Sequence, residues 1–232
     1  KKRSWGNQLF FCLITEFICS NTSQNIWQSI HGGVLGMYRP VNHGYIETVI
    51  GPMYSGKSEE LIRRLKRAKI AKQNIVVFKP QIDDRYSKED VVSHSGDSIK
   101  AIPISDSNQI YDHIDEKTQV VGIDEVQFFD DNIVDVSYRF SRSGNKSYCQ
   151  LELDMDFKGE AFGPTSKTFS GNLNLLDKIQ AICSVCGQPA TRSQRLINGK
   201  PARYNDPIIQ VGAVESYEAR CRKCHVVYRE DK

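Results

Sequence analysis

The sequence predicts an α/β fold with a mostly parallel sheet and a small zinc-binding lobe near the C-terminus. Three observations lead to this prediction. A glycine-rich loop, Gly51–Ser58, lies between a strand-like run and a helical run. Further short apolar runs alternate with helical segments, as in folds with a parallel sheet. Two C-x-x-C pairs follow near the end of the chain, in a pattern typical of zinc sites.

The loop matches the phosphate-binding pattern G-x-x-x-x-G-K-S/T at every fixed position. Residues 45–50 before it are β-branched and aromatic, and residues 58–72 after it are good helix formers without Gly or Pro. In this order, backbone N–H groups cradle phosphate oxygens, Lys57 reaches the β- and γ-phosphates, and Ser58 binds Mg²⁺. The predicted phosphate-binding residues of the loop are Gly51, Met53, Tyr54, Ser55, Gly56, Lys57 and Ser58. The alternative is a plain glycine-rich turn with an incidental lysine.

Two later apolar runs, residues 74–78 and 119–123, have the character of buried parallel strands. Between them the chain is turn-rich over residues 86–97. We then expect a strand over residues 99–104 and a helix over residues 107–114.

Asp124 and Glu125 directly follow the strand predicted at residues 119–123, at the edge where open α/β sheets bind ligands. Asp124 is placed to hold Mg²⁺, and Glu125 to take a proton from a bound hydroxyl during phosphoryl transfer. The alternative is an exposed pair that caps the next turn. Gln127 is assigned to the same phosphate-binding set. Phe128 beside it either stacks a base or belongs to the core.

Asp83 and Arg85 follow the strand predicted at residues 74–78, again at the edge of the sheet where ligands bind. Arg85 is a candidate for stabilising charge on a transferring phosphoryl group. A solvated turn is the alternative for this charged run.

Cys183 and Cys186 form one C-x-x-C pair, and Cys221 and Cys224 form the other. Four thiolates at this spacing predict a tetrahedral Zn²⁺ site that stabilises a small lobe. Two disulfides are the alternative, but a phosphate-binding loop points to a reducing, ATP-containing compartment. His225 is an alternative fourth ligand.

Composition sets limits on the remaining possibilities. The chain has 232 residues, and its formal net charge of +3 is too small to indicate polyanion binding. Residues 1–36 begin Lys-Lys-Arg and contain an apolar run that is too short to span a bilayer. We expect residues 1–36 to be a non-native or disordered leader, residues 37–180 a P-loop domain, and residues 181–232 a zinc-binding lobe.

Six motifs in this order resemble the cytosolic-type (type II) thymidine kinases, including bacterial, Bacillus-like members. The motifs are GPMYSGKS, KPQIDDRYS, IDEVQFF, LDMDFKGEAFGP, CSVC and ESYEARCRKC. The resemblance implies a RecA-like α/β domain with a zinc-stapled lasso lobe, assembled as a homotetramer. It also implies ATP, Mg²⁺ and structural Zn²⁺ as cofactors.

By the same resemblance, Glu125 is the general base for the deoxyribose 5′-hydroxyl, and Asp83 and Arg85 serve phosphate and magnesium. The residues that the resemblance places around the base are Phe128, Leu153, Phe157, Ile208, Gly212 and Tyr217. We therefore predict a cytoplasmic thymidine kinase that acts on thymidine or deoxyuridine in nucleotide salvage. Neither nucleic acid nor a membrane is expected as a partner.

The chain departs from the family between the motifs. Residues 137–143 and 149–152 are polar where an amphipathic helix and a hydrophobic strand are usual. This suggests a poorly packed core at residues 137–153 and, as an alternative function, a catalytically impaired remnant. A further alternative is a P-loop ATPase with a zinc-ribbon binding module.

Overall fold

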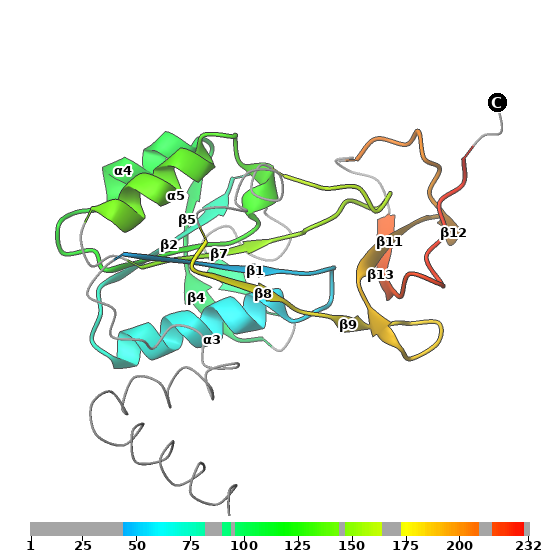
Figure 1. Ribbon diagram of the computed structural model, residues 1–232, viewed down its shortest axis with the longest axis horizontal. Coiled ribbons are helices and arrows are strands. Elements are labelled where there is room, and N and C mark those ends of the chain that lie inside the picture. Colours follow the sequence, from blue (N-terminus) through cyan, green and yellow to red (C-terminus); the bar gives the residue numbers. More distant parts are fainter. Residues whose placement is uncertain are drawn as a thin grey trace, which may run out of the picture. The chain divides into compact units, whose positions relative to one another are not determined.

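Six parallel strands form the central sheet, in the order β5-β2-β6-β7-β1-β8 (Figure 1). The computed structural model describes residues 44–81, 90–93, 96–143, 147–163, 173–208 and 215–229. The predicted leader, residues 1–36, lies outside these ranges. The strands are β1 (Tyr45–Ile50), β2 (Ile75–Pro80), β5 (Ile102–Ile104), β6 (Val120–Ile123), β7 (Ser147–Glu152) and β8 (Leu175–Lys178). The predicted α/β class with a parallel sheet is confirmed.

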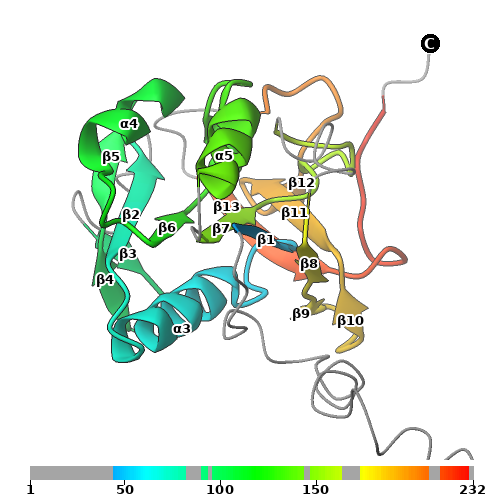
Figure 2. The same ribbon diagram turned by 60° about the vertical axis from the view of Figure 1, so that its left-hand side comes forward.

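Helices cover both faces of this sheet (Figures 1 and 2). On one face, α3 (Lys57–Ile70) buries Leu61 and Leu65 against Val49 of β1 and Cys149 of β7. On the other face, α4 (Ile110–His113) and α5 (Ile133–Arg142) pack on Val121, Ile123 and other core residues. Because both faces are covered, the predicted strands β2 and β6 are apolar over most of their length, whereas the neighbouring β1 and β7 also bury polar side chains.

The helix after the phosphate-binding loop begins at Lys57, one residue earlier than predicted, and ends at Ile70. Gly56 precedes it with φ +83°, in the left-handed region that glycine adopts without a steric penalty. Glu59 and Glu60 lie in its first turn, and Arg67 and Lys69 in its last, which suits the helix dipole. The strand–loop–helix order expected around the phosphate-binding motif is therefore present.

The polar stretch from residue 137 onward does form a helix and a strand. The helix α5 begins at Ile133, so its buried face contains Ile133, Val136 and Phe140 at helical spacing. Ser137 is buried on this face, and its hydroxyl donates to the Ile133 carbonyl oxygen at 2.6 Å. The strand β7 spans Ser147–Glu152 at the centre of the sheet.

Three other local predictions need correction. The strand expected over residues 99–104 is two strands, β4 (Ser98–Lys100) and β5, which belong to different sheets. The turn-rich segment before it contains β3 (Asp90–Val92), which pairs with β4. The helix expected over residues 107–114 is a 3₁₀ turn, η1 (Ser107–Gln109), followed by the short α4. Each correction concerns a segment of only three or four residues, where pairing partners decide the structure.

The C-terminal part is built from short antiparallel strands. They are β9 (Ala181–Ile182), β10 (Pro189–Ala190), β11 (Arg192–Ile197), β12 (Lys200–Pro201) and β13 (Glu215–Arg220). The first two form a hairpin, and the others form a sheet in the order β12-β11-β13. Ile208 lies in a bend, and residues 209–214 lie outside the described residues.

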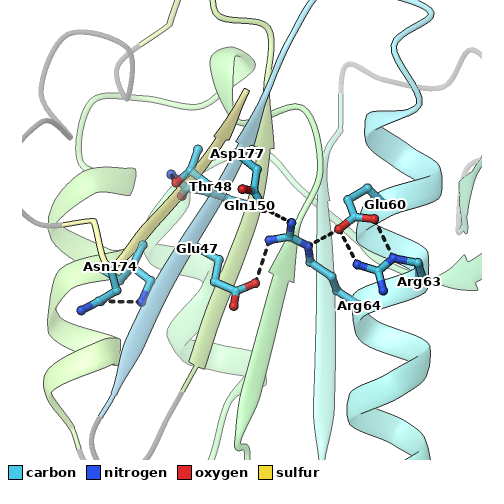
Figure 3. Close-up of polar contacts among 9 residues, drawn as sticks. Glu47, Thr48, Glu60, Arg63, Arg64, Gln150, Asn174 and Asp177 are labelled. Atoms are coloured by element: carbon cyan, nitrogen blue, oxygen red, sulfur yellow. Dashed lines mark hydrogen bonds and ion pairs between the residues drawn. The ribbon is translucent and has the colours of Figure 1, made fainter. Parts of the chain in front are cut away.

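A buried ion-pair cluster joins α3 to the sheet (Figure 3). Arg64 of α3 is 1% exposed and donates to Glu47 of β1 at 2.8 Å and to Glu60 at 2.7 Å. It also pairs with Asp177 of the edge strand β8. One guanidinium therefore links the phosphate-loop helix, the strand before the loop and the edge of the sheet.

Candidate functional site

The phosphate-binding loop is held by its own hydrogen bonds and by a contact from the C-terminal lobe. Lys57 Nζ and Ser55 Oγ both donate to the Pro52 carbonyl oxygen, at 2.9 and 2.8 Å. The Met53 N–H donates to Ser193 Oγ of β11 at 3.0 Å. These contacts fix the loop conformation around the start of α3, where the helix dipole favours an anion.

The two carboxylates at the end of β6 differ in environment. Asp124 is 7% exposed, and its N–H donates to the Phe78 carbonyl oxygen at 3.0 Å. Its Oδ1 accepts the N–H of Glu125 at 3.0 Å. Glu125 has φ +50°, a conformation that costs a non-glycine residue about 1–3 kcal/mol and is concentrated at functional sites.

The loop and the acidic pair line one cavity. The empty volume of this cavity is about 710 Å³, and part of that volume is open to solvent. From the sequence-predicted set it is lined by Met53, Tyr54, Ser55, Gly56, Lys57, Ser58, Asp124, Glu125 and Leu153. The predicted juxtaposition of the acidic pair with the glycine-lysine loop across a shared sheet edge is therefore present in the structure.

Gly51 is buried beside this cavity and does not line it. A Cβ at Gly51 would lie 2.6 Å from the Ile179 carbonyl oxygen, so the loop needs glycine here for close backbone packing. Gln127 does not line the cavity either, and its side chain contacts Glu125 and Leu153. The roles predicted for both residues at the phosphates stay predictions.

Several residues of the cavity were not anticipated from the sequence. They are Glu59, Lys79, Asp90, Val91 and Val92. Lys79 is the second-last residue of β2, near the same sheet edge as Asp124 after β6. It is 3% exposed, and its Nζ donates to the Asp90 carbonyl oxygen at 3.4 Å. The rule that singled out Asp124, a polar residue at the carboxyl end of a buried strand, also applies to Lys79. The β3 residues had no such signal.

The motif after Glu125 makes two specific contacts. Gln127 Nε2 donates to a Glu125 carboxylate oxygen, and Gln127 Oε1 accepts the Leu153 N–H at 3.1 Å. Phe128 is half-buried and packs edge-on against Phe162, with ring centroids 6.0 Å apart. Phe128 is therefore in contact with an aromatic neighbour, while Phe129 is in the core.

Phe157 and Tyr217 both adjoin β11. The Phe157 ring is 3% exposed and lies under the Arg195 guanidinium, 5.2 Å from its centroid. Tyr217 on β13 is half-buried and pairs with Arg195 in the strand register. Ile208 is 41% exposed. Asp83, Arg85 and Gly212 lie outside the described residues, so their predicted roles stay predictions.

The four paired cysteines meet in one cluster, as their spacing predicted. The sulfur atoms of Cys183, Cys186, Cys221 and Cys224 all lie within 4.8 Å of one another. Cys186 Sγ and Cys221 Sγ are 3.6 Å apart, which excludes a bond of about 2.05 Å between them and suits the tetrahedral edge of about 3.8 Å that Zn–S bonds of about 2.3 Å imply. The cluster therefore fits a Zn²⁺ ion.

The thiols of this cluster have pKa values that are shifted in opposite directions. Burial raises the pKa of Cys183, but hydrogen bonds from backbone N–H groups, first from Cys221, have the larger combined effect and lower the pKa to about 6. Hydrogen bonds with Cys186 and Cys221 raise the pKa of Cys224 to about 12. Without a cation, such neighbours cannot all ionise together; a bound Zn²⁺ would favour the thiolate at each.

His225, the alternative fourth ligand, has another partner. Its Nε2 lies 2.8 Å from the Phe157 carbonyl oxygen, to which it donates. Burial lowers the pKa of His225, so the ring is neutral at pH 7. Cys224, with its sulfur in the cluster, is the better fourth ligand.

The described helices contain none with the length and apolar character needed to cross a membrane. In a comparison with known protein families, the family model described as thymidine kinase matches residues 44–225. The matched range includes the phosphate-binding loop, the acidic pair and all four clustered cysteines.

Proposed function

The chain belongs to the thymidine kinase family, and from this premise we propose that it transfers the γ-phosphate of ATP to the 5′-hydroxyl of thymidine or deoxyuridine. The observation that carries the proposal is the single cavity lined by Lys57, Ser58, Asp124, Glu125 and Leu153. Phosphate-binding, metal-binding and proton-accepting groups are thereby close enough to act on one pair of substrates.

In this proposal the loop binds the ATP phosphates through its backbone N–H groups and Lys57. Ser58 and Asp124 would hold Mg²⁺, which would offset the charge of the phosphates. Asp83 and Arg85 add to phosphate and magnesium binding. Gly51 supports the loop from behind, where there is no room for a side chain.

Glu125 acts as the general base. Its carboxylate takes the proton of the 5′-hydroxyl while that oxygen bonds to the γ-phosphorus and the bond from phosphorus to the β-phosphate oxygen breaks. The products are ADP, the nucleoside 5′-monophosphate and one proton, so atoms and charge balance. General-base assistance of this kind contributes about 10²–10⁴-fold in rate.

The nucleoside lies on the side of the cavity away from the phosphates. Leu153 lines the cavity, and we propose that Phe128 and Phe157 pack on the base while Tyr217 and the segment from Ile208 to Gly212 hydrogen-bond its edges. A site that hydrogen-bonds both edges of a pyrimidine rejects analogues without those groups.

We further propose the type II subclass, a homotetrameric assembly, a cytoplasmic location and a structural Zn²⁺ on the four cysteines. The resemblance of the motifs to type II enzymes supports the first three. The sulfur geometry supports the last.

Transfer of labelled phosphate from ATP to thymidine tests the proposal. We expect transfer by the purified chain, and a fall of about 10²–10⁴-fold in Glu125→Gln, which keeps the shape of the side chain but cannot take a proton. Glu116→Gln, on an exposed glutamate, is the matched control and should be unchanged. ATP hydrolysis without transfer to any nucleoside would instead identify an ATPase.

A further inference from the structure

We propose that Gln127 is a positioning residue, which orients the Glu125 carboxylate for proton removal. The proposal rests on the proposed role of Glu125 and adds to it how the base is held in place. It also departs from the phosphate-binding role that the sequence suggested for Gln127, because this side chain contacts Glu125 and Leu153.

The contact with Leu153 fixes which end of the Gln127 amide faces the base. The backbone N–H of Leu153 can only donate, so the atom that faces it, at 3.1 Å, must be the amide oxygen. The NH₂ group then points in the opposite direction, where it donates to the Glu125 carboxylate. A flipped amide would lose both hydrogen bonds at once.

Packing holds this amide in place as well. Gln127 is 5% exposed. Gly163 lies against it with φ +82°, and a Cβ at Gly163 would be 2.6 Å from Gln127 Cβ and 2.7 Å from a carboxylate oxygen of Glu152. The neighbouring rings of Phe128 and Phe162 pack edge to face. The side chain of Gln127 therefore has little room to adopt another rotamer.

Glu125 needs such a partner because of where it lies. It lines the cavity, is only partly buried, and itself adopts the left-handed backbone conformation, two residues after β6. A side chain there has several rotamers, and only some bring the carboxylate to a hydroxyl. A displacement of about 1 Å at a reacting group costs up to about 10²-fold in rate.

Two substitutions separate positioning of Glu125 from support of Leu153. Gln127→Glu keeps an oxygen for the Leu153 N–H but replaces the donor that faces Glu125 by a like charge. Gln127→Met removes both hydrogen bonds at nearly the same volume and adds no charge. We expect both to lower kcat for thymidine phosphorylation by about 10–10²-fold, with KM for thymidine and ATP changed far less in the uncharged variant.

A double-mutant cycle with Glu125→Gln gives the decisive readout. If Gln127 acts through the carboxylate, Gln127→Met should cost almost nothing further once Glu125 is already Gln. Thermal unfolding of each variant checks folding; if Gln127→Met does not fold, Gln127→Glu, which retains the Leu153 contact, carries the test.

Two results would overturn the proposal: wild-type kcat in Gln127→Glu, or the same fold-loss from Gln127→Met with and without Glu125. Both differ from a failure of the proposed function itself. In that case no thymidine would be phosphorylated at all, and if only the role of Glu125 failed, Glu125→Gln alone would retain full activity.

Discussion

Arg64 is an arginine with almost no exposed surface that faces three carboxylates, Glu47, Glu60 and Asp177 (Figure 3). Its neighbour Arg63 pairs with Glu60 at 2.7 Å on the outside of the same helix, with 42% of its side chain exposed. The two adjacent arginines therefore make the same kind of contact in opposite environments, which provides a matched comparison.

We predict that Arg64→Met lowers the free energy of unfolding by about 3–5 kcal/mol, because it leaves the buried carboxylate of Glu47 without its cation. Arg63→Met should cost about 0.5 kcal/mol or less, as exposed helix pairs do. Urea unfolding at pH 7 measures both. Equal losses in the two variants would contradict the argument.

The stability lost in Arg64→Met should also depend on pH. Burial raises the pKa of Glu60, but hydrogen bonds from Arg63 and Arg64 outweigh it and hold the pKa below its usual 4.5. A lowered pKa gives stability that is present above about 4.5 and is lost as pH falls through the folded value. The difference in stability between wild type and Arg64→Met should therefore shrink on acidification below about pH 4.5. A constant difference down to pH 3 would contradict this linkage.

At the scale of single elements, the strand β7 carries polar groups into the centre of the sheet. Among the described residues, the Tyr148 hydroxyl and Gln150 Oε1 are buried without a hydrogen-bond partner. Burial raises the pKa of Tyr148; the nearby Ser137 hydroxyl opposes this, but it donates its proton to the Ile133 carbonyl. A buried polar group left unpaired costs about 1–3 kcal/mol.

Tyr148→Phe should therefore stabilise the protein by about 1 kcal/mol, since it removes the unpaired hydroxyl and keeps the ring. Tyr111→Phe, at an exposed tyrosine, should change stability by less than about 0.5 kcal/mol. Thermal and urea unfolding report both values. Destabilisation by Tyr148→Phe would show that the hydroxyl is hydrogen-bonded in solution, and would count against a poorly packed core at residues 137–153.

Elements with a strong local signal were predictable, and those made by distant pairing were not. β1 and β6 are short apolar runs, and the glycine-rich motif lies between a strand and a helix, so the ligand edge of the sheet followed from the sequence. β8 had no such signal: Leu175 and Leu176 are followed by Asp177, and the segment becomes a strand by pairing with β1. For α5, the sequence prediction considered only residues 137–143, whereas the apolar face of the helix begins at Ile133.

Two serines also made this helix hard to predict from the sequence. Ser137 and Ser141 lie on its buried side, where each hydroxyl donates to a carbonyl oxygen three or four residues earlier in the chain, at 2.6 and 2.9 Å. A serine that satisfies its own hydroxyl in this way can take a core position, so polarity alone is a poor guide there. Likewise the contact of Gln127 with Leu153, 26 residues away, is contained in no local pattern.

At the scale of the whole molecule, the cysteine-containing lobe is tied to the phosphate-binding loop and to Phe157. Ser193 of β11 accepts the Met53 N–H of the phosphate-binding loop, and His225, next to Cys224, donates to the Phe157 carbonyl. The lobe has a small apolar core, in which Ala181, Ala190 and Ala219 pack with the cysteines. Such a core stabilises little by itself, so we expect the lobe to depend on a metal bound by the four cysteines.

We predict one Zn²⁺ per chain and a loss of thymidine phosphorylation when it is removed, because the ties to the phosphate-binding loop and to Phe157 relax with the lobe. Zinc content by mass spectrometry, and transfer rates before chelation, after chelation and after Zn²⁺ is added back, measure this directly. Cys186→Ser should behave like the chelated protein, whereas Ser193→Ala, which breaks only one tie, should cost about 0.5–1.5 kcal/mol of stability and leave zinc bound. If the metal-free chain keeps its full transfer rate, the cavity does not depend on the lobe, and the hydrogen bonds of Ser193 and His225 have no part in catalysis.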